Sequence, residues 1–240
     1  MLWGATQRQV AVGEAKMTLT ADNPMLYELG LHHLLIDSIQ SLKAVFSDQA
    51  LKKNWSIVWL KKERSSGSVG GAAGKATFLA NYPVEQGKLS EDAQARLHRI
   101  SVHESIHLMS PYQFPLWINE SLAEYYAWKM TDKAGLKTES PKQQWASMQT
   151  RYPHAKAGLY EADHKVTLLR DMSYYPLFYV KGAAFWQQID QALSEHGKSL
   201  DTFVKILNHS KTQLPADFVS AIQRIIGKPR WDTLESEYLI

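Results

Sequence analysis

Hydrophobic and polar positions alternate along the first third of the chain, as they do in half-buried β-strands. Residues 8–20 alternate on either side of Gly13, which predicts a short β-hairpin. Residues 55–60 form a short apolar run, and this segment and residues 76–82 predict two further strands. Between the hairpin and these strands, residues 26–46 have the helical period and predict one long helix.

From residue 90 onward the apolar positions recur every three or four residues, which is the period of an amphipathic helix. This pattern predicts helices near residues 90–109, 116–133, 140–150, 182–196, 199–208 and 215–225. The chain has no recognisable internal repeat and no long low-complexity tract. The order of elements therefore predicts an α+β fold, with a small sheet-bearing N-terminal lobe followed by a mainly helical C-terminal lobe.

The helix predicted over residues 90–109 has clear end signals, because Ser90 can cap its N-terminus and Pro111 stops it. At about 100° per residue, its apolar residues form two stripes that are expected to be buried. The stripes contain Val102, Ile106 and Met109, and Ala93, Leu97 and Ile100. Three polar residues lie on the opposite side and are expected to face solvent: Gln94, Ser101 and Ser105.

His103 and His107 lie between these stripes and, with Glu104, form a His-Glu-x-x-His pentad. Residues four apart on a helix are separated by about 40° around its axis, so both imidazoles can reach one ion. Glu104 lies beside the pair, where its carboxylate could accept a proton from a water molecule at that ion. The pentad predicts a zinc site, with two hydrogen-bonded core histidines as the alternative.

A catalytic zinc site needs a third protein ligand, and the helix predicted over residues 116–133 offers Glu120. Glu124 lies one turn later on the same helix face, where it could accept the free N–H of a ligand histidine. The alternative for these two carboxylates is a solvated acidic face, although the bulky apolar side chains of Trp117 and Tyr125 lie close to them along the helix.

The pentad, followed by Trp-Ile-Asn-Glu-Ser-Leu-Ala-Glu-Tyr-Tyr over residues 117–126, resembles the gluzincin metallopeptidases. This group includes thermolysin, the aminopeptidase N-like enzymes and the glycyl aminopeptidases. The resemblance implies that Glu120 is the third zinc ligand. It further implies that Glu124 is an acid that supports the ligands without binding the ion, and that Asn119 holds a ligand histidine in place. It also implies one Zn²⁺ ion in a cleft between the two lobes.

A second block, Tyr-x-Lys-Gly-Ala over residues 179–183, resembles the aminopeptidase N-like and glycyl aminopeptidase-like proteins. In that family the tyrosine hydroxyl stabilises the oxyanion that forms during hydrolysis, so the resemblance gives this role to Tyr179. Tyr174 is a further candidate for substrate contact. Without the resemblance, Tyr179 is an aromatic residue ahead of a helix that begins near Gly182, and a role in the core is the alternative.

The resemblance covers roughly residues 25–235, which predicts a peptidase domain over residues 25–240. Residues 1–24 then form an N-terminal strand or hairpin extension, readable as the remnant of an upstream domain. Twelve residues separate His107 from Glu120, a shorter link than in thermolysin or the aminopeptidase N-like enzymes. This link suits a trimmed version of the fold.

A second departure concerns the strand before the pentad. The aminopeptidase N-like enzymes carry a Gly-x-Met-Glu-Asn strand whose Glu binds the substrate amine, whereas residues 70–76 here contain no acid. Glu85 is the candidate to take its place. The backbone of Gly71 and Ala72 could also pair with an extended peptide by strand addition. An ordinary Gly/Ser-rich loop over residues 65–74 is the alternative.

Composition narrows the class of protein. At 240 residues with 45% hydrophobic content, the chain can bury a substantial core. A net charge of +3 and a pI of 8.9 are too mild to predict nucleic-acid binding. No apolar stretch reaches the ~20 residues of a membrane-spanning helix.

Because the chain has no cysteine, histidine and carboxylate are the side chains left to bind a metal ion. The abrupt start, without a charged-then-apolar leader, fits either a cytosolic protein or an extracytoplasmic one whose signal or upstream part lies outside this sequence, and we expect the second.

Together these features predict a zinc-dependent peptidase that acts on a peptide or protein substrate. Glu104 would be the general base, and Zn²⁺ and Tyr179 would share the oxyanion. A peptidase-like domain that binds peptide or protein without cleaving it is the main alternative, and a metal-free helical interaction domain is another. The natural substrate, the choice between endopeptidase and exopeptidase, and the oligomeric state stay open.

Overall fold

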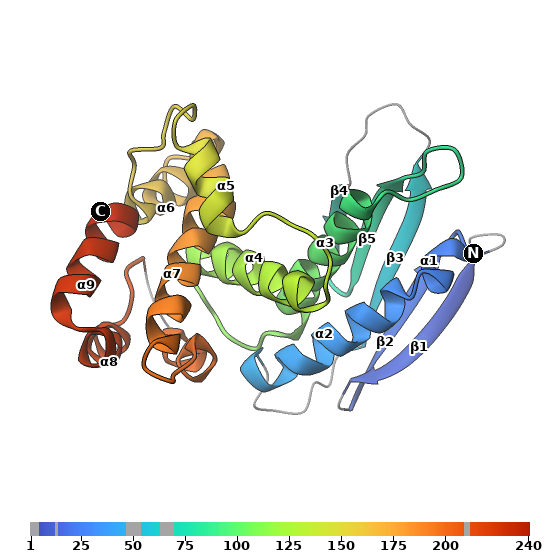
Figure 1. The fold of residues 1–240 in the computed structure, drawn as a ribbon, viewed down its shortest axis with the longest axis horizontal. Helices are drawn as coiled ribbons and strands as arrows, with labels where there is room; N and C mark the ends of the chain where they lie inside the picture. The colour runs from blue at the N-terminus through green and yellow to red at the C-terminus, as the bar shows by residue number, and fades with distance from the viewer. Residues whose placement is uncertain (1–4, 13, 47–53, 63–69, 209–211) are drawn as a thin grey trace. The chain divides into compact units, whose positions relative to one another are not determined.

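The computed structural model of the chain describes residues 5–12, 14–46, 54–62, 70–208 and 212–240 (Figure 1). The chain divides into two compact units: unit 1 is Met1–Pro111 with Tyr126–Thr138, and unit 2 is Tyr112–Tyr125 with Glu139–Ile240. The division falls within helix α4, Leu116–Lys133. The expected boundary between an extension over residues 1–24 and a peptidase domain over residues 25–240 stays a prediction.

Unit 1 contains a mixed five-stranded sheet in the order β1-β2-β3-β5-β4. Its strands are β1 Thr6–Val12, β2 Ala15–Ala21, β3 Trp55–Lys62, β4 Gly70–Ala73 and β5 Thr77–Pro83. β1 and β2 form the predicted hairpin, although its expected turn residue, Gly13, lies outside the described residues. β3 runs parallel to both β2 and β5, and β4 pairs antiparallel with β5 at the edge.

Burial alternates along the strands of this sheet, as it does when one face of a sheet is covered. In β3, Trp55, Ile57 and Trp59 are buried, and the residues between them are only partly covered. The strand register places Trp59 between Ala21 of β2 and Ala80 of β5. Two small neighbours in the same row leave room for the indole ring, so the largest side chain of the strand fits into the core.

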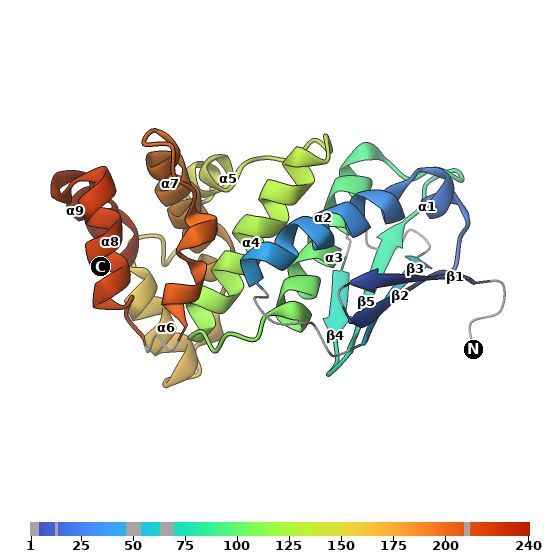
Figure 2. The same ribbon diagram turned by 90° about the horizontal axis from the view of Figure 1, so that it is seen from below.

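Helices α2, Leu31–Phe46, and α3, Glu91–Met109, lie together on one face of the sheet (Figure 2). The prediction of a single helix over residues 26–46 is wrong at its start. A short helix α1, Met25–Glu28, ends before Gly30, whose φ is +73°. This left-handed conformation is favourable for glycine and interrupts the helical hydrogen bonds, so α2 begins only at Leu31.

On α3, the expectation that Ser101 and Ser105 face solvent is wrong. Both serines are fully buried. Their hydroxyls donate to the carbonyls of Leu97 and Ser101, one turn earlier, at 2.7 Å each. Ser101 Oγ also accepts a hydrogen bond from Trp59 Nε1 at 2.9 Å. Small side chains that bond to their own helix can be buried, so this side of α3 packs against the sheet.

Unit 2 is mainly helical, as predicted. Besides the first part of α4, its helices are α5 Pro141–Met148, α6 Leu159–Thr167, α7 Ala183–Ser194, α8 Ala216–Ile226 and α9 Lys228–Leu234. Shorter 3₁₀ or π-helical turns are η1 Met172–Tyr174, η2 Phe178–Gly182, η3 Leu200–Thr202, η4 Val204–Leu207 and η5 Glu235–Leu239. None of the helices in the described part of the chain has the length and hydropathy that crossing a bilayer requires.

The prediction of one helix over residues 199–208 is wrong. The segment forms the two 3₁₀ turns η3 and η4 instead. Asp190 of α7 accepts the backbone N–H of Leu200 at 2.7 Å, and the Ser199 hydroxyl accepts that of Asp201 at 3.2 Å. These side-chain acceptors at successive N–H groups hold a tight turn at the start of the segment.

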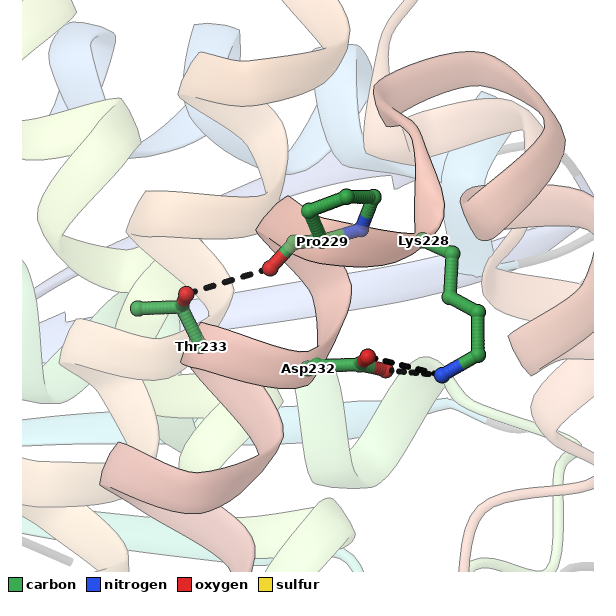
Figure 3. A network of polar contacts seen from close by, with 4 residues as sticks. All are labelled: Lys228, Pro229, Asp232 and Thr233. Atoms are coloured by element: carbon green, nitrogen blue, oxygen red, sulfur yellow. Dashed lines mark hydrogen bonds and ion pairs between the residues drawn. The ribbon is translucent and has the colours of Figure 1, made fainter.

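Helix α9 lies where the sequence predicted none, and its seven residues are too few to show a helical period. Gly227 precedes it with a φ of +85°, which favours glycine. Lys228 Nζ donates to both carboxylate oxygens of Asp232 at 2.7 and 2.8 Å, and Thr233 Oγ1 donates to the Pro229 carbonyl at 3.1 Å (Figure 3). An exposed ion pair at this spacing contributes about 0.3–0.5 kcal/mol, so packing stabilises α9 more than its charges do.

A polar network crosses the core of unit 1. His98 of α3 is 1% exposed. Its Nε2 lies 3.1 Å from Ser38 Oγ of α2, and its Nδ1 lies 2.9 Å from Thr131 Oγ1 of α4. Both ring nitrogens therefore have partners although the residue is buried, and the imidazole links three helices.

This network predicts that unit 1 is sensitive to acid. Burial lowers the pKa of His98 to about 4, from an ordinary value of 6.5. Between these two values the unfolded chain binds more protons than the folded protein, so the free energy of unfolding falls as the pH drops. We expect the melting temperature to fall between about pH 6.5 and pH 4, and to fall less in His98→Gln, whose side chain does not titrate. Thermal melts followed by circular dichroism measure this, and equal slopes for the two proteins would contradict it.

Candidate metal centre

Helix α3 presents His103 and His107 one turn apart, with their Nε2 atoms 3.0 Å from each other. Their ring centroids are 4.7 Å apart and their planes are inclined by 79°. Two nitrogens that bind one tetrahedral zinc ion at ~2.0–2.1 Å are about 3.4 Å apart. The observed separation is near this value and also suits a hydrogen bond between the two rings, so both imidazoles are oriented toward a common point.

Glu120 of α4 completes the group. One ligand atom from each of His103, His107 and Glu120 lies within 4.8 Å of the other two. His103 is 4% and Glu120 9% exposed, and His107 is half-buried. The twelve-residue link therefore does not prevent Glu120 from reaching the histidines. Burying a carboxylate is costly unless a cation or hydrogen bonds compensate it, and two histidines with one glutamate form a known set of catalytic zinc ligands.

Contacts inside unit 2 hold the first turn of α4, which precedes Glu120. The backbone N–H of Trp117 lies 3.4 Å from Asp163 Oδ1 of α6, and the Trp117 indole N–H donates to the Thr212 carbonyl at 2.8 Å. Asp163 is 4% exposed, and burial raises the pKa of its carboxyl. An acceptor at a helix N-terminus satisfies an N–H group that has no partner within the helix. Asp163 therefore stabilises the turn from which Glu120 extends.

Tyr179 lies in the π-helical turn η2, beside Glu120. Its hydroxyl lies 3.5 Å from the Tyr175 hydroxyl, and the Glu120 carboxylate is near enough for its charge to act on the phenol. Burial is the largest cause of a raised pKa for Tyr179, followed by the hydrogen bond with Tyr175 and the charge of Glu120. The phenol therefore keeps its proton near neutral pH and is available as a hydrogen-bond donor.

The close approach of η2 to α4 depends on a glycine. A methyl group at Gly182 would lie 2.5 Å from Ser121 Cβ, closer than two carbon atoms can approach. Ser121 follows Glu120 directly, and Gly182 lies in the same turn as Tyr179. The Ser121 hydroxyl also accepts a hydrogen bond from Trp186 Nε1 of α7 at 2.7 Å. This contact brings the backbones together where Tyr179 meets Glu120.

Glu104 lies on the side of α3 that solvent reaches. Arg96 is exposed, and Ile100, Glu104 and His107 are half-buried at successive helical intervals. Ile100 was expected in a buried stripe and lies on this side instead, whereas the other stripe residues are buried, as predicted. Because α3 buries the side that carries Ser101 and Ser105, Glu104 lies on a side that water can reach.

Asn119 and Glu124 lie on α4, one residue before and one turn after Glu120, and both are half-buried. Their roles beside the ligands stay predictions. Tyr174 lies in η1, and its ring stacks on His154 at a centroid distance of 4.0 Å. Tyr175, which the sequence reasoning missed, contacts Tyr179. Its spacing of four residues from Tyr179 is the signal that could have identified it.

Two segments of unit 1 were predicted to contact substrate, one at Glu85 and the other at Gly71 and Ala72. Glu85 is exposed and closes a tight turn with Lys88, in which Gln86 and Gly87 have positive φ. Gly71 and Ala72 belong to the edge strand β4, so a loop is wrong for Gly70–Ala73, and the preceding part of the expected loop lies outside the described residues. Amine binding by Glu85 and peptide pairing along β4 stay predictions.

In sequence, the chain matches no protein-family model and no curated protein. In fold, it matches solved structures over 98% of its length. One is an aminopeptidase N family protein from Idiomarina loihiensis, with 15% identity and a TM-score of 0.64. Another is a Glu→Ala variant of a two-domain M1 zinc metallopeptidase bound to L-tryptophan, with 12% identity and a TM-score of 0.55. A third is an M1 zinc metallopeptidase variant from Deinococcus radiodurans bound to a Tyr-Ser-Ala substrate, with 12% identity and a TM-score of 0.53.

The chain spans 46%, 51% and 52% of these three chains, about half of each. Identities this low establish similarity of fold. The predicted fold class is confirmed: the chain is α+β, with a sheet followed by a helical region, and matches catalytic domains of the M1 zinc metallopeptidases.

The contact between Gly182 and Ser121 predicts a steric effect. Gly182→Ala must displace either Ser121 or η2, and overpacking of this kind costs about 1–3 kcal/mol. Gly74→Ala is the matched control, because its added methyl group would meet only the Thr77 carbonyl oxygen at an ordinary 3.5 Å. Urea unfolding measures both variants. Equal stability of the two variants would contradict the close approach.

Proposed function

We propose that this chain is a zinc-dependent peptidase. The observation that carries the proposal is the meeting of His103, His107 and Glu120, with the Tyr179 phenol near the same glutamate. A set of three metal ligands with a neutral donor beside it has the parts that peptide hydrolysis requires. The fold supports this reading, since matching solved structures include M1 zinc metallopeptidases bound to an amino acid or a peptide substrate.

Zn²⁺ is the ion that best suits this donor set. Two imidazoles and one carboxylate leave a fourth tetrahedral position for water or substrate. When bound, the ion would lower the pKa of a water molecule and polarise the carbonyl of a peptide bond. Glu124 and Asn119, half-buried next to the ligand on α4, would orient His103 and His107 through hydrogen bonds.

Glu104 would act as the general base. It follows His103 directly on α3, on the side that solvent reaches, so a water molecule can approach its carboxylate. A carboxylate in this position takes a proton from the attacking water and passes it to the leaving amine.

Tyr179 would stabilise the oxyanion. Because burial and its neighbours raise the pKa of the phenol, it stays protonated and donates a hydrogen bond to the carbonyl oxygen as negative charge develops there. Tyr175, whose hydroxyl lies 3.5 Å from that of Tyr179, would hold the phenol in this orientation.

The substrate would be a peptide in extended conformation, paired along the edge strand β4. The four residues of β4 are Gly70, Gly71, Ala72 and Ala73, which offer backbone groups and no carboxylate for a terminal amine. Selection of a free N-terminus would therefore depend on an acid elsewhere, with Glu85 as the candidate.

The metal site predicts that zinc stabilises the folded protein. An ion that binds only the folded state raises its stability by about 2.7 kcal/mol at 100 times the dissociation constant. We expect Zn²⁺ to raise the melting temperature of the wild type and not that of His107→Ala, with one bound ion per chain by elemental analysis. His33→Ala is the matched control, because His33 is an exposed histidine of the same unit. Equal binding by His107→Ala would contradict the assigned ligands.

The assignment of Glu104 predicts a loss of turnover without a loss of metal. Glu104→Gln should lower hydrolysis by on the order of 10²–10⁴-fold, since the base is removed and the side chain keeps its shape. Glu91→Gln, an exposed glutamate on the same helix, is the control. Mass spectrometry of a diverse peptide library, with free and acetylated N-termini, measures turnover and shows whether cleavage needs a free amine. Undiminished turnover by zinc-loaded Glu104→Gln would contradict the mechanism.

A further inference from the structure

Lys181 is a buried lysine in η2 for which the proposed reaction has no direct use. Its side chain is 3% exposed. Its Nζ donates to the Ala157 carbonyl at 2.7 Å and lies 5.4 Å from the centroid of the Trp145 ring on α5. The ammonium group therefore ties η2 to two segments of unit 2 that lie outside its own helix.

Stability alone does not explain a lysine at this position. Burying an ammonium group is costly, and apolar side chains of similar volume often replace buried charges without loss of stability. Burial is also the main cause that lowers the pKa of Lys181 to about 8, against the attraction of Glu237 and Glu161, which raises it. The lysine instead provides a directional donor to a backbone carbonyl and a cation on an aromatic face, and these two contacts together fix its orientation.

The turn that Lys181 holds is unusual. Residues Phe178–Gly182 form a π-helical turn that continues directly into α7. Such turns are rare and often lie at functional sites, because the wider turn is less favourable than an α-helical one and needs contacts outside the helix. Tyr179 and Lys181 are two residues apart, so at about 100° or less per residue they point in roughly opposite directions. Tyr179 contacts Glu120 on one side, and Lys181 holds the turn from the other.

We propose that Lys181 is a positioning residue that holds η2 so that the Tyr179 hydroxyl lies at the Glu120 carboxylate. Gly182 allows the approach to α4, and Lys181 stabilises the turn from the side of Trp145 and Ala157. The expected effect of Lys181 on catalysis rests on the proposed peptidase function, whereas its effect on the position of Tyr179 does not.

The first experiment tests the placement of Tyr179 without any activity. 3-Fluorotyrosine is introduced at position 179, and ¹⁹F NMR spectra are recorded for the wild type, Lys181→Met and Lys181→Arg. We expect the resonance to shift and broaden in Lys181→Met and to stay nearer the wild type in Lys181→Arg, which keeps a cation and N–H donors. If the methionine variant does not fold, Lys181→Gln takes its place in the same spectra.

Ile222→Val is the control for a general loosening of unit 2, because Ile222 is fully buried in α8 and the shorter side chain leaves a small cavity there. Its spectrum should match the wild type. An unchanged resonance in the charge-removing variant, or the same change in Ile222→Val, would overturn the proposal.

The second experiment is a double-mutant cycle with Tyr179→Phe on the zinc-loaded protein. A small displacement of a group at the reacting centre can cost up to about 100-fold in rate, so Lys181→Met should lower kcat by roughly 10- to 100-fold with KM unchanged. In the Tyr179→Phe background the same substitution should change kcat by less than about twofold, since the hydroxyl it positions is gone. Equal losses in both backgrounds would refute positioning through Tyr179. If the wild type cleaves no peptide, the proposed function fails, and the fluorine spectra still decide the role of Lys181.

Discussion

The candidate site depends on one steric constraint, the backbone approach of η2 to α4 at Gly182 and Ser121. A single methyl group between them would lie at 2.5 Å, so no other amino acid fits without movement. The candidate metal ligand and the candidate hydrogen-bond donor lie next to this contact. Glu120 precedes Ser121, and Tyr179 lies in the turn with Gly182. Packing between two helical segments thus determines which hydroxyl meets which carboxylate.

A comparable constraint sets the histidines inside unit 1. The Trp59 indole occupies the row between two alanines of the sheet, and its N–H bonds to Ser101 of α3. Because Ser101 is bound to the sheet, His103 and Glu104 follow at fixed rotations around the same helix. The core of unit 1 therefore orients two of the groups that the proposed reaction uses.

The sequence predicted the fold class and the meeting of His103, His107 and Glu120, because the order of elements and the helical spacing of these residues can be read from the sequence. The pentad and Glu120 lie on long helices, and Ser90 and Pro111 mark the ends of the first one. The side of α3 that Ser101 and Ser105 bury was predicted wrongly, since a serine that bonds its own helix behaves as a small core residue. The contacts of Tyr175 and Lys181 with their neighbours were not predicted, because they depend on the shape of η2. The period of apolar residues in a sequence does not predict a π-helical turn.

The π-helical turn also bears on how such a chain can vary in length. Deleting or adding one residue within Phe178–Gly182 would rotate every preceding side chain by about 100° relative to α7, and Tyr179 would turn away from Glu120. The link between His107 and Glu120 follows a different rule, because a connection can change length as long as both helices keep their packing. Changes of length in either direction should therefore be tolerated between α3 and α4 and be excluded from the Tyr-x-Lys-Gly turn. This difference accounts for a sequence in which the turn is still recognisable while the link is short.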